Sequence, residues 1–242
     1  MFLETIAFIG SGRNEQVSIY LGVNGVANKI GTREIDEILE EYKESILSEA
    51  KLEARNDRNS QLLYVHLPDK TLVYNSTASQ AFNESVWSVL STSITGFEQY
   101  RARDFVFAYD KWLVGDSLGN NVGHFTNDVG SHWGETITWE FSTKMIYNEG
   151  NRAIINELEL VSLPGRIELG LDPRMSTSYS TDGISFSDEK YIKVGKIGET
   201  NKRLAWFRNG LMRLFRIQRF RGDSTAHVTF LRLEAQIEPL VE

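Results

Sequence analysis

Residues 171–205, LDPRMSTSYSTDGISFSDEKYIKVGKIGETNKRLA, contain the clearest fold signal in the chain. Between Met175 and Ser180, β-forming side chains alternate with serines, which is the pattern of a strand with one buried face. Asp182-Gly183 then predicts a turn, because aspartate bonds its own backbone and glycine accepts a positive φ. We expect the return strand to start at residues 184–187, which makes a β-hairpin, and a basic strand to follow at 203–206.

The first residues predict another hairpin. Residues 5–9 form a compact apolar run, and residues 17–21 alternate apolar and polar side chains after a turn at 11–14. This hairpin starts almost at residue 1, so no preceding segment covers its sheet edge. Because native proteins usually cover such edges, we expect the chain to be the C-terminal part of a longer protein.

One amphipathic helix is predicted near residues 33–54. Its apolar side chains recur at three- and four-residue intervals, which places them on one stripe of an α-helix. They are Ile35, Ile38, Leu39, Tyr42, Ile46 and Leu47. Thr32 can cap the N-terminus of this helix. The opposite face is rich in glutamate, and a solvated face is favoured there over a docking site for a partner helix.

The remaining pattern predicts strands in two domains, 1–128 and 129–242, separated by the glycine-rich segment 120–134. In the first domain, strands are expected at 61–67, 71–74, 86–90, 101–109 and 111–114. Four-stranded units of ~40 residues are typical of β-propellers, so we expect about two to three blade-like units. In the second domain, strands about ten residues apart favour a β-sandwich. They are expected at 136–141, 157–163, 204–207, 211–219 and 227–236, beside the hairpin. The predicted fold class is therefore all-β.

The composition is that of a mixed-charge protein. The 242 residues have a net charge of -7 and no cysteine, which excludes disulfides and thiolate metal sites. No apolar run approaches the ~20 residues of a membrane span. Residues 1–4 lack the basic and apolar regions of a signal peptide. We therefore expect a soluble protein that is made in the cytoplasm.

Basic residues concentrate near the C-terminus. Residues 191–232 contain ten lysines or arginines and two acids, whereas the rest of the chain has 16 bases and 31 acids. This asymmetry indicates either the solvent side of strands, which we favour, or a face for phosphate or an acidic subunit. The candidate interaction face consists of Arg213, Arg216, Arg219 and Arg221. Direct DNA contact is not assigned to it, because the rest of the chain is strongly acidic.

No catalytic, cofactor-binding or metal-binding residue is predicted. His66, His124, His132 and His227 lack the spacing of zinc ligands. Residues 180–186 resemble the aspartate box of sialidase-type propellers, which is a hairpin turn, and no motif supplies the catalytic groups of a glycosidase. The five tryptophans are more typical of core packing than of an exposed sugar platform. A carbohydrate-binding or glycosidase-type β protein is the alternative function.

Seven short motifs, taken in their order, resemble one protein family. They are Glu4–Phe8, Thr32–Ile35, Trp112–Asp116, Asp172-Pro173, Ser180–Gly183, Gly195–Glu199, and Arg203 with Trp206. Together they are similar to the packaged-DNA stabilisation proteins, or tail hubs, of short-tailed bacteriophages (podoviruses). The turn at residues 182–184 is shorter than the family pattern and the segment after Ala235 is not diagnostic, which leaves the subfamily open.

The resemblance implies a non-enzymatic structural protein of the virion tail that includes a β-propeller. It implies a hub that plugs the portal channel, retains the genome and lies near the packaged DNA. The implied partners are the head-to-tail adaptor, the tail needle and the tailspikes. Copies of the protein itself are expected to form a ring, which we expect to be hexameric and closed by heterologous interfaces. The resemblance implies no cofactor.

Overall fold

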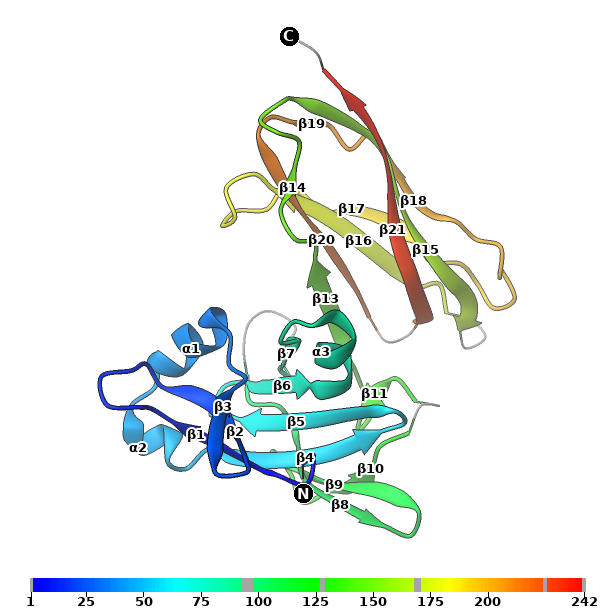
Figure 1. Ribbon diagram of the computed structural model, residues 1–242. Coiled ribbons are helices and arrows are strands. Elements are labelled where there is room, and N and C mark those ends of the chain that lie inside the picture. The colour runs from blue at the N-terminus through cyan, green and yellow to red at the C-terminus, as the bar shows by residue number, and fades with distance from the viewer. Residues whose placement is uncertain (1, 93–97, 127–128, 168–170, 224–225, 241–242) are drawn as a thin grey trace. The chain divides into compact units, whose positions relative to one another are not determined.

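The computed structural model describes residues 2–92, 98–126, 129–167, 171–223 and 226–240. Strands dominate these residues and three short helices accompany them, which confirms the predicted all-β class. The chain divides into two compact units, Met1–Thr126 and Asn127–Glu242 (Figure 1). The predicted boundary between residues 128 and 129 adjoins residues 127–128, which lie outside the described residues, so its position stays a prediction.

The described residues of unit 1 form three antiparallel sheets. The first contains β1 (Ile6–Gly10), β2 (Ser18–Val23) and β3 (Val26–Lys29). The second contains β4 (Lys51–Asp57), β5 (Ser60–His66), β6 (Thr71–Asn75) and β7 (Trp87–Leu90), and the third contains β8 (Ala102–Ala108), β9 (Lys111–Asp116) and β10 (Val122–His124). Each sheet is a meander of consecutive strands, and the four-stranded one has the form of a propeller blade. The β1–β2 ladder confirms the predicted first hairpin, and the β5–β6 and β8–β9 ladders join strands expected at 61–67 and 71–74 and at 101–109 and 111–114.

The core of unit 1 is shared by the first two sheets. Ile19 and Leu21 of β2 and Leu63 and Val65 of β5 belong to one buried apolar cluster. Full burial of such a side chain contributes roughly 1.5–3 kcal/mol. Trp87 adds a polar link, because its indole Nε1 donates to the carbonyl of residue 30 at 3.0 Å. Apolar packing therefore holds these two sheets together.

The single helix predicted near residues 33–54 is wrong in extent. α1 spans Arg33–Glu40, α2 spans Glu44–Leu47, and residues 51–57 form β4 instead. α1 buries part of the predicted apolar stripe. Strand pairing prevails after residue 50 because every residue of β4 pairs with a residue of β5, which completes the four-stranded sheet.

A third helix, α3 (Ser76–Phe82), connects β6 to β7 and is not predicted by the sequence pattern. Asn75 caps it, because the side-chain Oδ1 accepts the Ala78 N–H at 3.0 Å. Asn83 ends it in the left-handed conformation, with φ of 52°. None of the helices in the described residues is long and apolar enough to cross a lipid bilayer.

The strands of unit 2 follow in one run along the chain. They are β11 (Ser131–His132), β12 (Glu135–Thr136), β13 (Thr138–Ser142), β14 (Ile146–Tyr147), β15 (Ala153–Ile167), β16 (Arg174–Ser180), β17 (Lys190–Lys193), β18 (Leu204–Phe207), β19 (Leu211–Met212), β20 (Phe215–Asp223) and β21 (Ala226–Pro239). One sheet has the order β13-β20-β16-β17, with β14 also paired to β20. In the other, β15 pairs with β21 on one side and with β18 and β19 on the other.

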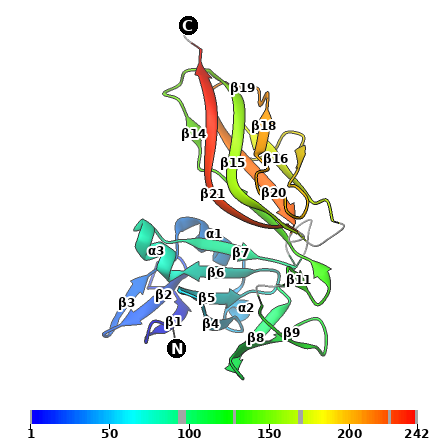
Figure 2. The same cartoon turned by 90° about the vertical axis from the view of Figure 1, so that its right-hand side faces the viewer.

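These two sheets of unit 2 pack face to face, which confirms the predicted β-sandwich (Figure 2). Leu160 and Leu204 of one sheet and Met175 and Phe220 of the other are buried in a shared cluster. Trp206 joins them, and its ring centroid lies 5.5 Å from that of Phe220. Trp206 is therefore used in core packing, as the sequence favours for the tryptophans.

The return strand predicted at residues 184–187 is wrong. β16 forms as expected, but residues 181–189 are a loop and its partner β17 begins only at residue 190. The carboxylate of Asp182 accepts the N–H groups of Ile184 and Ser185, each at 2.8 Å. Those two amides are therefore engaged in a local turn and cannot join a strand ladder.

Candidate functional site

The four arginines of the predicted interaction face do not lie on one surface. Arg213 precedes β20, whereas Arg216, Arg219 and Arg221 belong to it. Successive side chains of a strand point to opposite sheet faces, so Arg219 and Arg221 share one face and Arg216 lies on the other. A role of Arg213, Arg219 and Arg221 in binding a partner stays a prediction.

Arg216 is buried inside the sandwich, so its assignment to an exposed face is wrong. It is 1% exposed. Its Nη1 donates to Asn209 O at 2.6 Å and its Nε donates to Gln218 Oε1 at 2.8 Å. The guanidinium carbon lies 3.8 Å from the ring centroid of Tyr179. Burial lowers the pKa of Arg216 to about 10, and the side chain acts as an internal link between β20 and the loop before β19.

Arg219 and Arg221 lie on the outer face of their sheet but are engaged by their own chain. The guanidinium of Arg219 stacks on Phe186 at 3.8 Å, and its Nε donates to Ser178 Oγ at 3.0 Å. Arg221 forms ion pairs with Glu140 and with Glu189, the latter at 3.0 Å. The loop 181–189 thus covers this face of the sheet.

The turn that resembles an aspartate box is a structural anchor. Besides two backbone N–H groups, Asp182 accepts the hydroxyl of Ser185 and that of Ser180, the latter at 2.9 Å. These bonds, with the one from Ser185 first, hold the pKa of Asp182 well below its usual range. The carboxylate is saturated by its own loop, which suits a turn and not a catalytic group.

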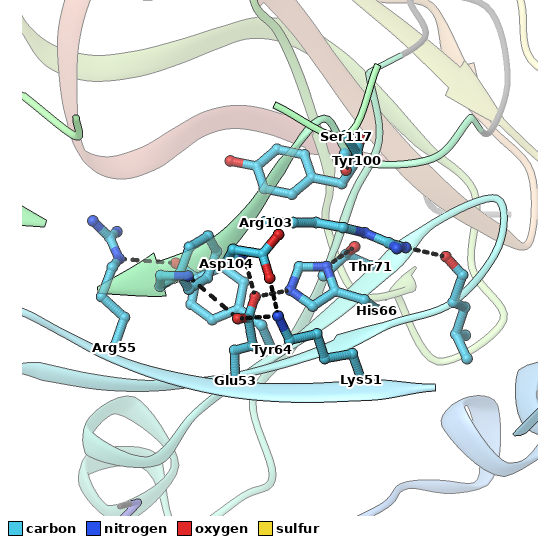
Figure 3. A network of polar contacts seen from close by, with 12 residues as sticks. Lys51, Glu53, Arg55, Tyr64, His66, Thr71, Tyr100, Arg103, Asp104 and Ser117 are labelled. Carbon is cyan, nitrogen blue, oxygen red and sulfur yellow. Dashed lines mark hydrogen bonds and ion pairs between the residues drawn. The ribbon is translucent and has the colours of Figure 1, made fainter. Parts of the chain in front are cut away.

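A dense group of charges in unit 1 surrounds Glu53 (Figure 3). We call Lys51, Glu53, His66, Thr71 and Asp104 the Glu53 cluster. Ladder pairing places the first four residues on one face of the second sheet, because cross-strand partners share a face. Asp104 comes from β8 of the third sheet. The cluster therefore lies where two sheets of unit 1 meet.

His66 is fully buried and is held on both of its ring nitrogens. Its Nε2 lies 2.9 Å from Glu53 Oε2 in a bent contact, which is an ion-pair distance and not a linear hydrogen bond. Its Nδ1 lies 3.0 Å from Thr71 Oγ1. Tyr64 stacks on the imidazole with ring centroids 6.2 Å apart. These contacts fix the ring in one orientation.

Glu53 joins the second sheet to the third. Its Oε2 accepts the Asp104 N–H at 3.1 Å, and its Oε1 accepts the Phe105 N–H at 3.2 Å. Lys51 Nζ lies 3.0 Å from Oε1 and also contacts the Asp104 carboxylate. Burial alone would raise the pKa of Glu53, but the close contacts with His66 and Lys51 outweigh it and lower the pKa to about 2. The carboxylate is therefore ionised at neutral pH and anchors β8.

The segment that Glu53 anchors is irregular. Asp104 has a φ of 60°, in the left-handed region, and the β8–β9 ladder shifts register between Arg103 and Val106. A bulge of this kind takes residues out of the regular ladder. Two successive N–H groups are thereby free to converge on one carboxylate, which offsets the cost of the strained backbone.

Sequence reasoning missed this cluster. The alternation of Lys51, Glu53 and Arg55 indicates a strand face, but the helix predicted near residues 33–54 includes Lys51 and Glu53. His66 lies in a strand, as expected from the pattern of residues 61–67, and it is buried. The sequence does not predict which side chains contact its imidazole. The contact with Asp104 joins residues about fifty positions apart, and no local signal in the sequence predicts that register.

The geometry of the Glu53 cluster suits a mechanical link. Each carboxylate oxygen of Glu53 accepts a backbone N–H group and also contacts the side chain of Lys51 or His66, so both oxygens are engaged within the chain. In the described part of the chain, no three His, Cys, Asp or Glu side chains converge as metal ligands would. What the cluster does is hold β8 against the second sheet.

The exposed aromatic side chains at the β8–β9 hairpin do not form a flat sugar platform. Tyr109 is 90% exposed at the turn, beside Phe107 and Trp112. The Phe107 and Trp112 rings cross at 60° with centroids 5.3 Å apart. A sugar ring stacks on coplanar faces, so this geometry does not favour the carbohydrate-binding alternative.

Comparison with known proteins gives the family of both units. A family model described as Bacteriophage P22 Gp10, beta-propeller, matches residues 1–130, and one described as Bacteriophage P22 Gp10, beta-sandwich, matches residues 138–238. The chain is 28% identical over 212 residues to the tail hub protein gp10 of Salmonella phage P22. That alignment covers 88% of this chain and 43% of the relative, so the chain spans less than half of the relative's length. The chain belongs to the P22 Gp10 family, with the propeller region of that family in its first unit and the sandwich region in its second.

Proposed function

We propose that this chain serves in the tail hub of a short-tailed phage, where it plugs the portal channel and retains the packaged DNA. The observation that supports this most is the colinear match of both units to Gp10, together with the similarity to a relative named as a tail hub protein. In this role the protein belongs to the virion tail after synthesis in the host cytoplasm. It joins the head-to-tail adaptor to the tail needle and the tailspikes.

The internal use of charge supports a structural role without enzymatic activity. Arg101 forms a bidentate pair with the buried Asp116, with Nε at 2.7 Å and Nη2 at 2.9 Å. Arg203 pairs with Glu159 and, at 2.6 Å, with Glu157. Such pairs fix surfaces in place and leave those carboxylates engaged. A hub needs stable surfaces of this kind for large protein contacts.

Copies of the chain are expected to form a ring, which we propose to be hexameric, around a channel near the packaged DNA. Direct binding of phosphate by Arg221 would require the loss of its ion pairs with Glu140 and Glu189. We therefore expect the hub to retain DNA by blocking the channel, with little sequence-independent DNA affinity of its own.

A retention assay tests the proposed function. DNA-filled heads of the phage that encodes this chain, carrying portal and adaptor but no hub, are incubated with the purified chain. We expect the chain to sediment with the heads and to slow the release of DNA to an added nuclease. Heads without the adaptor are the control and should not bind the chain. Equal DNA loss with and without the chain would contradict the proposal.

A further inference from the structure

In the described residues, neither edge of the four-stranded sheet of the sandwich has a further ladder partner, although Lys190 Nζ donates to Arg208 O beside one of them. β21 pairs only with β15, and β18 and β19 also pair only with β15, in the part of the chain that the structure describes. A free edge presents unpaired N–H and C=O groups that can pair with another strand. The two edges lie on opposite sides of β15, because Ala153 pairs with Met212 on one side and with Pro239 on the other.

One of these edges is basic and apolar. We call Phe207, Arg208, Leu211, Arg213 and Leu214 the basic edge. Phe207 and Leu214 are 59% and 53% exposed. Both arginines are exposed, and neither forms an ion pair with the described residues. Large apolar side chains beside unpaired cations are unusual on a surface that faces only water.

The opposite edge is acidic and apolar. We call Leu231, Glu234, Gln236, Ile237 and Glu238 of β21 the acidic edge. Leu231 and Ile237 are 63% and 41% exposed. Arg232 pairs with Glu234 at 2.5 Å, whereas among the described residues the Glu238 carboxylate has only a 3.4 Å approach of Asn156 Nδ2. Residues 234–239 contain two acids and no base.

The two edges lie at matching positions along β15 and run in the same direction. Glu157 pairs with Phe207 on one side and with Gln236 on the other. Ile154 likewise pairs with Leu211 on one side and with Glu238 on the other. Suppose a second copy lies beside the first without a shift along the strand direction. Its Arg208 then lies, along that direction, between Gln236 and Glu238 of the first copy. Both edges run antiparallel to β15, so they would meet as parallel strands.

We propose that copies of this chain join side by side through their sandwich units, with the basic edge of one copy against the acidic edge of the next. The inference rests on the self-association in the proposed function and names the surface responsible for it. Opposite charges meet at the rim, and the exposed apolar side chains of both edges become buried. The contact is heterologous, so repeated copies close into a ring when the rotation between neighbours allows it.

Charge reversal on each edge tests this assignment with the full chain. The first variant is R208E/R213E, the second is E234R/E238R, and the control is R13E/R58E, which reverses two exposed arginines of unit 1. Sedimentation and light scattering measure the oligomer at a series of concentrations. Each edge variant is expected to raise the dissociation constant by at least about tenfold, because like charges then face each other. The control is expected to assemble as the wild type does.

Mixing the two edge variants gives the second measurement and shows that they are folded. The reversed edges are complementary to each other, so an equimolar mixture is expected to regain oligomers although neither variant forms them alone. Wild-type assembly by both edge variants would overturn the proposal, as would a wild-type chain that remains a monomer. A dimer sensitive only to changes in the acidic edge would indicate β21 against β21, which also overturns it. DNA retention by the wild type would leave the hub role standing in each of these cases.

Discussion

Replacing Glu53 with glutamine is expected to destabilise unit 1 by about 3 kcal/mol at neutral pH. The magnitude follows from the pKa of Glu53, which falls from an ordinary 4.5 to about 2 in the folded chain. Each unit of pKa shift corresponds to about 1.4 kcal/mol. The side chain is only 10% exposed, so solvent screening reduces this figure little. Glutamine retains the shape of the side chain but not the charge that faces Lys51 and His66.

The sign of the pH dependence follows from the same shift. Because the pKa of Glu53 is lower in the folded state than in the unfolded chain, the stabilisation is fully present above pH 4.5. It is lost as the pH falls through about 2. The difference in unfolding free energy between wild type and E53Q should therefore shrink steadily between these two pH values.

Hydrogen exchange of individual peptides, measured by mass spectrometry at increasing urea concentrations, gives the unfolding free energy of each unit separately. A single unfolding curve for the whole chain would combine the two units. The informative peptides cover β4 and β8, which Glu53 connects. The matched control is E37Q, in an exposed pair with Arg33, where a change of no more than about 0.5 kcal/mol is expected. Equal effects of E53Q and E37Q, or an E53Q effect that does not change with pH, would refute the reasoning.

Two further predictions concern packing. Gly31→Ala should destabilise unit 1 by about 1–3 kcal/mol in urea unfolding, because the new Cβ would lie 2.3 Å from the buried Ser18 Oγ. Gly12→Ala is its control. The new Cβ there meets only a movable glutamate side chain, so the unfolding free energy should fall by less than about 0.5 kcal/mol. Phe220→Ala should destabilise unit 2 by about 3–5 kcal/mol, because Phe220 is fully buried. Phe207→Ala, at a position 59% exposed, is its control in monomer unfolding, and equal losses for the two would contradict the packing described for the core.

Local periodicity predicted much of the fold. Where it failed after β16, a side chain accepts the backbone N–H groups that the expected strand would have used. β16 is recognisable from strict alternation. The loop after β16 is not recognisable from the sequence, because the Asp182 carboxylate accepts two backbone N–H groups that the expected strand ladder would have used. The helix near residues 33–54 failed differently. The apolar stripe ends at Leu47, and the following residues alternate with a period of two, which is the better description of β4.

The candidate site was harder to predict, because its geometry depends on pairing between distant strands. The opposite parity of Arg216 and Arg219 is visible in the sequence, but which face of β20 is buried is not, since apolar residues occur on both faces. The Glu53 cluster needs the β4–β5 register and a bulge in β8, and neither has a local signature.

The charge asymmetry of residues 191–232 shows why net charge alone is a poor guide to a partner. Much of this basic charge is already engaged: Arg203 and Arg221 in ion pairs, and Arg216 in the sandwich interior. Arg208 and Arg213, which form no ion pair with the described residues, flank β19 at one edge of a sheet. The strand at the opposite edge carries Glu238 at the level of Leu211, close to that of Arg208. A second copy of this acidic chain therefore fits the unpaired cations better than DNA does, because the complementary charge and the complementary strand edge come from the same surface.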